Sequence, residues 1–188
     1  MSCQEAILEL YTMMSKLCRF SLKNIILILM IIETSCLPQY NWREILLADG
    51  HVHATFPDRI STEIYPTVLY GYDLNFSKSF VEISGALFTI NYAQLSPKLL
   101  QNHNVRMQLG HSMIQNLYLY LQVVPPDNFE DYGQDIEIYG NSEKDQNWLM
   151  ARIWVTDTML VEAIALGNKK NLSFDNAKKF LHSVVVKR

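Results

Sequence analysis

Cysteine is scarce in this 188-residue chain and is confined to its first part. The three cysteines are Cys3, Cys18 and Cys36, so no disulfide can form within the segment that follows Cys36. A domain without disulfides must be stabilised by its own hydrophobic core. The segment after Cys36, about 150 residues, is long enough to bury one such core.

Basic clusters, cofactor motifs and long apolar runs are missing as well. The formal net charge is −3 and Lys and Arg form no cluster, which excludes the basic surface that nucleic acids require. The sequence has no glycine-rich phosphate-binding motif and no Cys/His cluster with metal-ligand spacing, so no cofactor is expected. The apolar run 25–32 is shorter than the about 20 residues that span a membrane.

The N-terminal part of the chain has the order of residues that is typical of a bacterial export signal. Three basic residues precede the run 25–32, and small residues follow it: Lys16, Arg19 and Lys23, then Thr34 and Ser35. Basic residues before the apolar core retain that end in the cytoplasm, so the remainder should be exported. Met13 or Met14 is a more natural start than Met1. Residues 1–36 are therefore interpreted as an N-terminal extension plus a signal that ends at Cys36.

Cys36 distinguishes a lipoprotein signal from an ordinary cleaved one. Thr34-Ser35-Cys36 resembles bacterial lipoprotein signals, in which the cysteine thiol receives diacylglycerol. Each buried acyl CH₂ contributes ~0.8 kcal/mol, so two or more chains would anchor the protein to a membrane. Glu33 departs from the aliphatic residue usual there, and its carboxylate could slow or prevent processing. With Leu37 next, the expected location is the periplasmic side of the cell envelope, anchored in the outer membrane.

Residues 37–188 are predicted to form a single α+β domain. Alternating apolar residues predict strands over 42–47, 51–56, 68–76, 87–92, 133–139, 148–155 and 159–166. Asp49-Gly50 and Ser84-Gly85 should form hairpin turns. A helical stripe predicts a helix over 105–124, stopped by Pro125-Pro126, and Ser173 can cap a closing helix. The expected fold is a mostly antiparallel sheet with helices packed on it.

Several passages carry a resemblance to a known family. They are Tyr40-Asn41-Trp42-Arg43-Glu44, Phe56-Pro57, Gly85-Ala86-Leu87-Phe88, Tyr92-Ala93-Gln94-Leu95 and Ala177-Lys178-Lys179-Phe180-Leu181-His182-Ser183. Together they resemble a family of uncharacterised proteobacterial lipoproteins or signal-peptide proteins, over nearly all of residues 36–188. The order of elements is also similar to the PsbP-like fold, named after an extrinsic subunit of photosystem II. The resemblance implies that layered fold and supplies no catalytic residues. Asp157-Thr158 stands where the family often has Asp-Gly.

Two histidines are candidate metal ligands. His51 and His53 are two residues apart and would project from one face of a strand, a spacing that can present two imidazoles to a metal. No third ligand is identifiable, and the other interpretation is that both are exposed beside a turn. His103, His111 and His182 are scattered and are interpreted as surface or helix-end residues.

Two further motifs are open to a chemical interpretation. Gly110-His111-Ser112 is similar to the beginning of a serine hydrolase elbow, but Ile114 replaces the second glycine and the segment is predicted to be helical. The other motif is an acidic loop that could bind calcium or could be a solvated connection, and it contains Asp127, Glu130, Asp131 and Asp135.

Aromatic residues offer another kind of site. Most lie on predicted strands and should fill the core, whereas Tyr118 and Tyr120 lie off the apolar stripe of the predicted helix and are candidates for a ligand or partner surface.

Two hypotheses about function follow from the sequence. The first is a non-catalytic binding, accessory or scaffold module for an envelope protein or an apolar ligand. The second is a periplasmic enzyme or metal-handling protein whose site combines His51, His53 and the acids of 127–135.

Overall fold

The computed structural model describes residues 40–128, 132–141 and 147–187. The strands are β1 (Arg43–Leu47), β2 (Val52–Phe56), β3 (Ser61–Leu69), β4 (Tyr72–Ile83), β5 (Ala86–Gln94), β6 (Ile136–Tyr139), β7 (Asn147–Val155), β8 (Met159–Asn168) and β9 (Val185–Val186). The helices are η1 (Ala48–Gly50), which is a 3₁₀ helix, α2 (Pro97–Leu100), α3 (His103–Tyr120) and α4 (Phe174–Ser183). The export signal and Cys36 lie outside the described residues.

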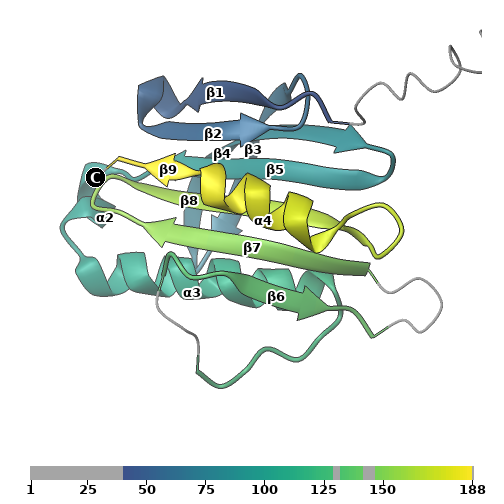
Figure 1. Cartoon of the computed structure of the whole chain (residues 1–188). Coiled ribbons are helices and arrows are strands. Elements are labelled where there is room, and N and C mark those ends of the chain that lie inside the picture. The colour runs from purple at the N-terminus through teal and green to yellow at the C-terminus, as the bar shows by residue number, and fades with distance from the viewer. Residues whose placement is uncertain (1–39, 129–131, 142–146, 188) are drawn as a thin grey trace, which may run out of the picture. The chain divides into compact units, whose positions relative to one another are not determined.

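The strands form two antiparallel sheets (Figure 1). The larger sheet has six strands in the order β3-β4-β5-β8-β7-β6, and the smaller has three in the order β1-β2-β9. The central pair of the larger sheet, β5 and β8, joins two parts of the chain that are distant in sequence, with Asn91 opposite Glu162. Each face of the large sheet is covered by a separate hydrophobic cluster.

The expected α+β layer fold, with helices packed on a single sheet, is wrong. Strands hold 46% of the described residues and helices 25%, and the strands divide into two sheets. The hairpin of β1 and β2 does not extend the large sheet; it pairs with β9 and shares a core with α4 and one face of the large sheet. Val52, Ala54 and Phe56 of β2 are fully buried in this core. One face of the large sheet is therefore covered by strands as well as by a helix. Alternation alone could not show which sheet these strands join.

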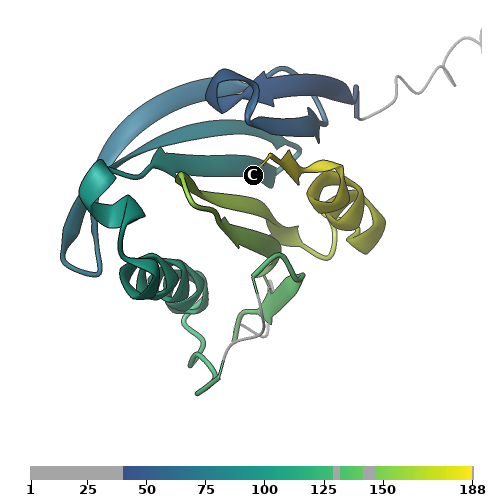
Figure 2. The ribbon, with the colours of Figure 1, turned by 90° about the vertical axis from the view of Figure 1, so that its left-hand side faces the viewer.

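The other face of the large sheet packs against α3 (Figure 2). Leu109, Met113 and Leu117 of this helix are buried, as expected for residues spaced four apart on one helical face. Asn102 caps the helix by accepting a hydrogen bond from the Val105 amide at 3.1 Å. The helix ends at Tyr120 rather than at residue 124, and Val124 is exposed.

Several predicted elements are confirmed, and one strand is not. The hairpins across Asp49-Gly50 and Ser84-Gly85 are present, and so is the helix capped by Ser173. The predicted strand 68–76 is wrong, because the chain turns at Tyr70-Gly71 and separates β3 from β4. Both turn residues have positive φ, 49° and 75°, a geometry typical of two-residue hairpin loops. The sequence did not indicate this turn, because Tyr70 stands at the first position, where Asn, Asp or Gly is usual.

No helix in the described parts of the chain is both long enough and apolar enough to cross a membrane.

Candidate ligand-binding pocket

A pocket of about 460 Å³ lies between α3 and the six-stranded sheet. Its walls are mostly apolar, and the side chains that form them include Leu69, Phe76, Met113, Leu117, Leu149 and Leu166. Residues of β3, β4, β5 and β8 line it because alternate side chains of these strands point toward α3. We call this space the sheet-helix pocket. Its volume is within the range of small-molecule sites, about 300–1,000 Å³.

Polar residues cross this apolar pocket in one row. Glu63 of β3 lies opposite Lys78 of β4, Lys78 lies opposite Asn91 of β5, and Asn91 lies opposite Glu162 of β8. All four residues line the pocket. Because directly opposite residues in neighbouring strands share a face, the register brings four polar groups together without any loop.

Hydrogen bonds divide the row into two pairs. At the exposed end, Lys78 Nζ donates to Glu63 Oε1 at 2.9 Å. Deeper in the pocket, Asn91 Nδ2 donates to Glu162 Oε2 at 2.7 Å, and Thr89 Oγ1 donates to Asn91 Oδ1 at 3.4 Å. Across residues 40–128, 132–141 and 147–187, no Lys, Arg or His forms an ion pair with Glu162.

The pocket changes the acidity of two of its residues. Burial raises the pKa of the Glu162 carboxyl group to about 7, although the hydrogen bond from Asn91 acts in the opposite direction. Burial, and then the negative charges of Glu162 and Glu63, raise the pKa of Tyr65 to about 12. At neutral pH, Glu162 therefore exists in both protonation states, while Tyr65 is a neutral phenol. Such a carboxyl group can accept or donate a hydrogen bond to a bound molecule.

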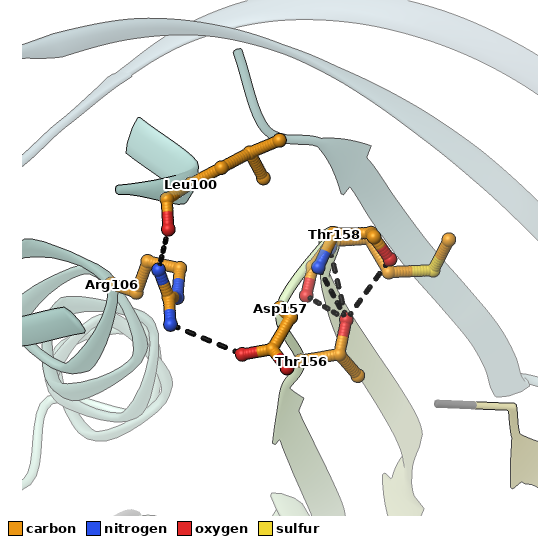
Figure 3. A network of polar contacts seen from close by, with 6 residues as sticks. Leu100, Arg106, Thr156, Asp157 and Thr158 are labelled. Atoms are coloured by element: carbon orange, nitrogen blue, oxygen red, sulfur yellow. Dashed lines mark hydrogen bonds and ion pairs between the residues drawn. The ribbon is translucent and has the colours of Figure 1, made fainter. Parts of the chain in front are cut away.

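Arg106 fixes the beginning of α3 against the turn between β7 and β8 (Figure 3). This side chain is 7% exposed; its Nη1 donates to the carbonyl oxygen of Leu100, and its Nη2 lies 3.1 Å from Asp157 Oδ1. Thr156 Oγ1 accepts hydrogen bonds from the amides of Thr158 and Met159, at 3.2 and 2.9 Å, which closes the turn. The network holds the helix that forms one wall of the pocket. It also shows that Asp157-Thr158 makes a tight turn without glycine.

A second polar cluster lies outside the sheet-helix pocket. Asp135 Oδ1 accepts a hydrogen bond from Arg152 Nε at 2.9 Å, and its Oδ2 lies 2.9 Å from His182 Nε2. Burial opposes ionisation, but the hydrogen bonds from His182 and Arg152 outweigh it and lower the pKa of Asp135. The cluster joins β7 and α4 to the segment before β6. His182, for which the sequence showed no partner, is the histidine that meets this acidic residue.

The proposed metal ligands lie elsewhere. His51 is exposed after η1, and His53 on β2 is half-buried, with its Nε2 3.7 Å from Glu44 Oε2. No group of three or more His, Cys, Asp or Glu residues within the described ranges could hold a metal ion. The structure gives this pair of histidines no third ligand.

Within the described residues, Asp135 is the member of the acidic loop that joins a polar cluster, and the hydrolase-like motif is helical. Glu130 and Asp131 lie outside the described residues, and Asp127 is exposed. His111 lies within α3, where its ring stacks on Tyr132 with centroids 5.7 Å apart. Gly110-His111-Ser112 is thus part of a continuous helix rather than a turn between strand and helix.

The two tyrosines proposed as a binding surface lie in different places. Tyr120 is 67% exposed and lines the sheet-helix pocket at the end of α3. Tyr118 is half-buried and lines a smaller hollow of about 300 Å³ with Asp135 and Ile136. His103 is exposed at the start of the same helix.

Sequence reasoning missed the residues at the centre of the pocket. Asn91 and Glu162 are polar residues within strongly apolar strands, and this was the available signal. Isolated polar residues in buried strands require a partner, and here each is the other's partner. Their pairing could not be read from the sequence because 71 residues separate them.

Comparison of the chain with models of protein families, with characterised proteins and with solved structures finds no significant match.

Proposed function

We propose that this chain is a lipid-anchored protein of the bacterial cell envelope that binds a small apolar ligand in the sheet-helix pocket without transforming it. The export and anchoring part of the proposal is supported by the signal-like order of residues 16–36. The binding part is supported by the pocket itself. A non-catalytic role is favoured because, in the described parts of the chain, the polar contacts of His53 and Asp135 do not bring the two together: His53 lies near Glu44, and Asp135 contacts Arg152 and His182.

The observation that carries the proposal is an apolar space with a small polar row at one side. Apolar walls provide most of the binding free energy of a small ligand, and a few polar groups fix its orientation. In this pocket Leu69, Phe76 and Leu117 represent the first kind of group, while Asn91 and Glu162 represent the second.

A ligand with a short hydrocarbon chain tests this function. We suggest equilibrium dialysis of radiolabelled octanol against the full chain in lipid nanodiscs, with empty nanodiscs as the background. Thr67 lines the pocket from β3, and the neighbouring Val68 is 66% exposed. Because successive strand residues point to opposite faces, Thr67→Trp should fill the pocket and Val68→Trp should not.

The expected result is saturable octanol binding above background for the unchanged chain and for Val68→Trp, and its loss in Thr67→Trp. If the unchanged chain retains no more octanol than empty nanodiscs, the pocket is not a binding site for apolar ligands. Equal binding by Thr67→Trp would place the bound octanol elsewhere.

A further inference from the structure

The charged groups around the sheet-helix pocket are unevenly matched. From β3 come Glu63 and Tyr65, from β4 comes Lys78, from β8 comes Glu162, and from α3 comes Tyr120. The pocket residues of β5 and β7 carry no charge. The lining therefore has two carboxyl groups and one cationic side chain.

That cation is already engaged. Lys78 Nζ lies 2.9 Å from Glu63 Oε1 and 4.5 Å from the centroid of the Phe80 ring, so a salt bridge and a cation–π contact both hold it. The remaining carboxyl group, that of Glu162, has Asn91 as its only hydrogen-bonding side chain in the described part of the chain. Among the residues that the structure places, an ionised Glu162 thus has no cationic side chain as a partner.

We propose that the ligand of this pocket is an apolar primary amine, with its ammonium group paired to Glu162 and its hydrocarbon chain against Phe76, Met113 and Leu117. This inference rests on the proposed function and specifies the class of ligand. An ammonium group has three donors, which can reach the carboxylate of Glu162 and the side-chain oxygen of Asn91. A buried carboxylate is stabilised most by a cation that also hydrogen-bonds to it.

The same arrangement disfavours two related ligands. A fatty acid would place its carboxylate beside Glu162, and like charges in a desolvated site repel each other. An alcohol of equal length would fill the apolar space and could hydrogen-bond to Glu162, but it would bring no positive charge to pair with the carboxylate. Selectivity should therefore follow the order amine, alcohol, carboxylate.

The test compares octylamine, octanol and octanoate, which share one chain length, by equilibrium dialysis against the full chain in zwitterionic nanodiscs. Octylamine should bind at least about tenfold more tightly than octanol, because losing one partner of a buried charge pair costs several-fold to many-fold in affinity. Glu162→Gln should remove this preference, so that octylamine binds about as tightly as octanol. Glu82→Gln, the same substitution at an exposed position of β4, should retain it.

The possible outcomes test the amine assignment and the proposed function separately. If octanol binds as tightly as octylamine, the amine assignment is wrong and the proposed function stands. If none of the three exceeds the background of empty nanodiscs, the proposed function fails, and the amine assignment with it. An unchanged preference in Glu162→Gln would exclude Glu162 as the recognition group.

A second measurement uses only the unchanged chain, so it does not depend on whether a variant folds. Calorimetry of the unchanged chain at pH 6, in buffers of different ionisation enthalpy, reports the protons released on binding. Since Glu162 is mostly protonated at that pH, octylamine should displace roughly one proton per molecule bound, and octanol none. Amine binding without proton release would overturn the proposed ion pair.

Discussion

Glu162 lies between Val161 and Ala163, in a strand whose other residues are nearly all apolar. Its carboxyl group is desolvated by the pocket walls, and the single hydrogen bond from Asn91 does not restore the water it has lost. The folded chain therefore favours the protonated acid more strongly than the unfolded chain does. This preference has a measurable effect on stability.

Burial raises the folded-state pKa of Glu162 to about 7, above the ordinary glutamate value of 4.5. A raised pKa contributes stability that is fully present below about pH 4.5 and is lost as the pH rises through 7. We predict that Glu162→Gln, which carries no titrating group, becomes more stable than the unchanged chain between pH 5 and pH 8, by up to about 3 kcal/mol at the upper end. Urea unfolding followed by tryptophan fluorescence measures the difference.

Glu82→Gln is the matched control for this titration. Glu82 is exposed on β4, so its replacement should change the free energy of unfolding by less than about 0.5 kcal/mol. A stability difference for Glu162→Gln that does not vary with pH would show that the Glu162 carboxyl group is not desolvated as the structure indicates.

At the level of elements, Gly110 determines how closely α3 approaches the rest of the domain. A Cβ atom at this position would lie 2.5 Å from Val155 Cγ2 and 2.6 Å from Tyr132 Cε1. The Tyr132 hydroxyl donates to the carbonyl oxygen of Met107 at 2.5 Å, so this ring cannot move away without losing a hydrogen bond. Gly110 is thus required for the close packing of this helix.

Gly110→Ala should therefore destabilise the domain despite the higher helix propensity of alanine. Propensity alone would add about 1 kcal/mol of stability, whereas overpacking costs typically 1–3 kcal/mol. We expect a net loss of up to about 2 kcal/mol in urea unfolding. Gln115→Ala, at an exposed position of the same helix, should change stability by less than about 0.5 kcal/mol. A gain of stability in Gly110→Ala would contradict the close packing of α3.

The cluster of Asp135, Arg152 and His182 joins α4 to the large sheet. Because the folded-state pKa of Asp135 is lowered, its stabilising contribution is present above the usual aspartate range and disappears as the pH falls through the lowered value. Asp135→Asn should cost roughly 1–3 kcal/mol at neutral pH, the range for charged hydrogen bonds, and progressively less in acid. Thermal unfolding at pH 7 and at pH 3 tests this.

Asp127→Asn provides the comparison, since Asp127 is exposed in the neighbouring loop and should tolerate the change at both pH values. A cost for Asp135→Asn that is equal at pH 3 and pH 7 would mean that this residue acts through its shape rather than its charge.

Local structure was more predictable than the assembly of the strands. Ser173 and Asp49-Gly50 act through short-range geometry, and the sequence identifies both. Tyr70-Gly71 was missed because alternation continued through the turn. The division into two sheets depends on which distant strands pair, and local patterns do not contain that information. Tyr120 was identified as a candidate because its position on the helix follows from local periodicity. Glu162 was not identified, because its position beside Asn91 depends on the pairing of distant strands.

At the scale of the whole molecule, the expected lipid anchor decides whether the domain is found at the membrane or in the soluble periplasmic fraction. We predict that Cys36→Ser moves the protein from the membrane fraction to the soluble periplasmic fraction in a Gram-negative host, because the acyl chains expected on Cys36 would hold it on the bilayer. Metabolic labelling with an alkyne fatty acid should mark the unchanged chain and not this variant.

Cys18→Ser is the matched control and should keep both the label and the membrane location. Labelling that survives in Cys36→Ser, or an unchanged chain that carries no label, would remove the lipoprotein interpretation. Glu33→Leu adds a graded test, since restoring an aliphatic residue should increase the processed fraction if Glu33 slows maturation.

The pairing of β5 with β8 has a consequence for the order of events during synthesis. Asn91 and Glu162 are contributed by segments 71 residues apart, and α3 is formed by residues between them. Pairings between distant segments form slowly, because closing the long intervening loop costs entropy before the contacts are made. A polypeptide interrupted before β8 therefore lacks Glu162, Ile164 and Leu166, and with them one wall of the sheet-helix pocket.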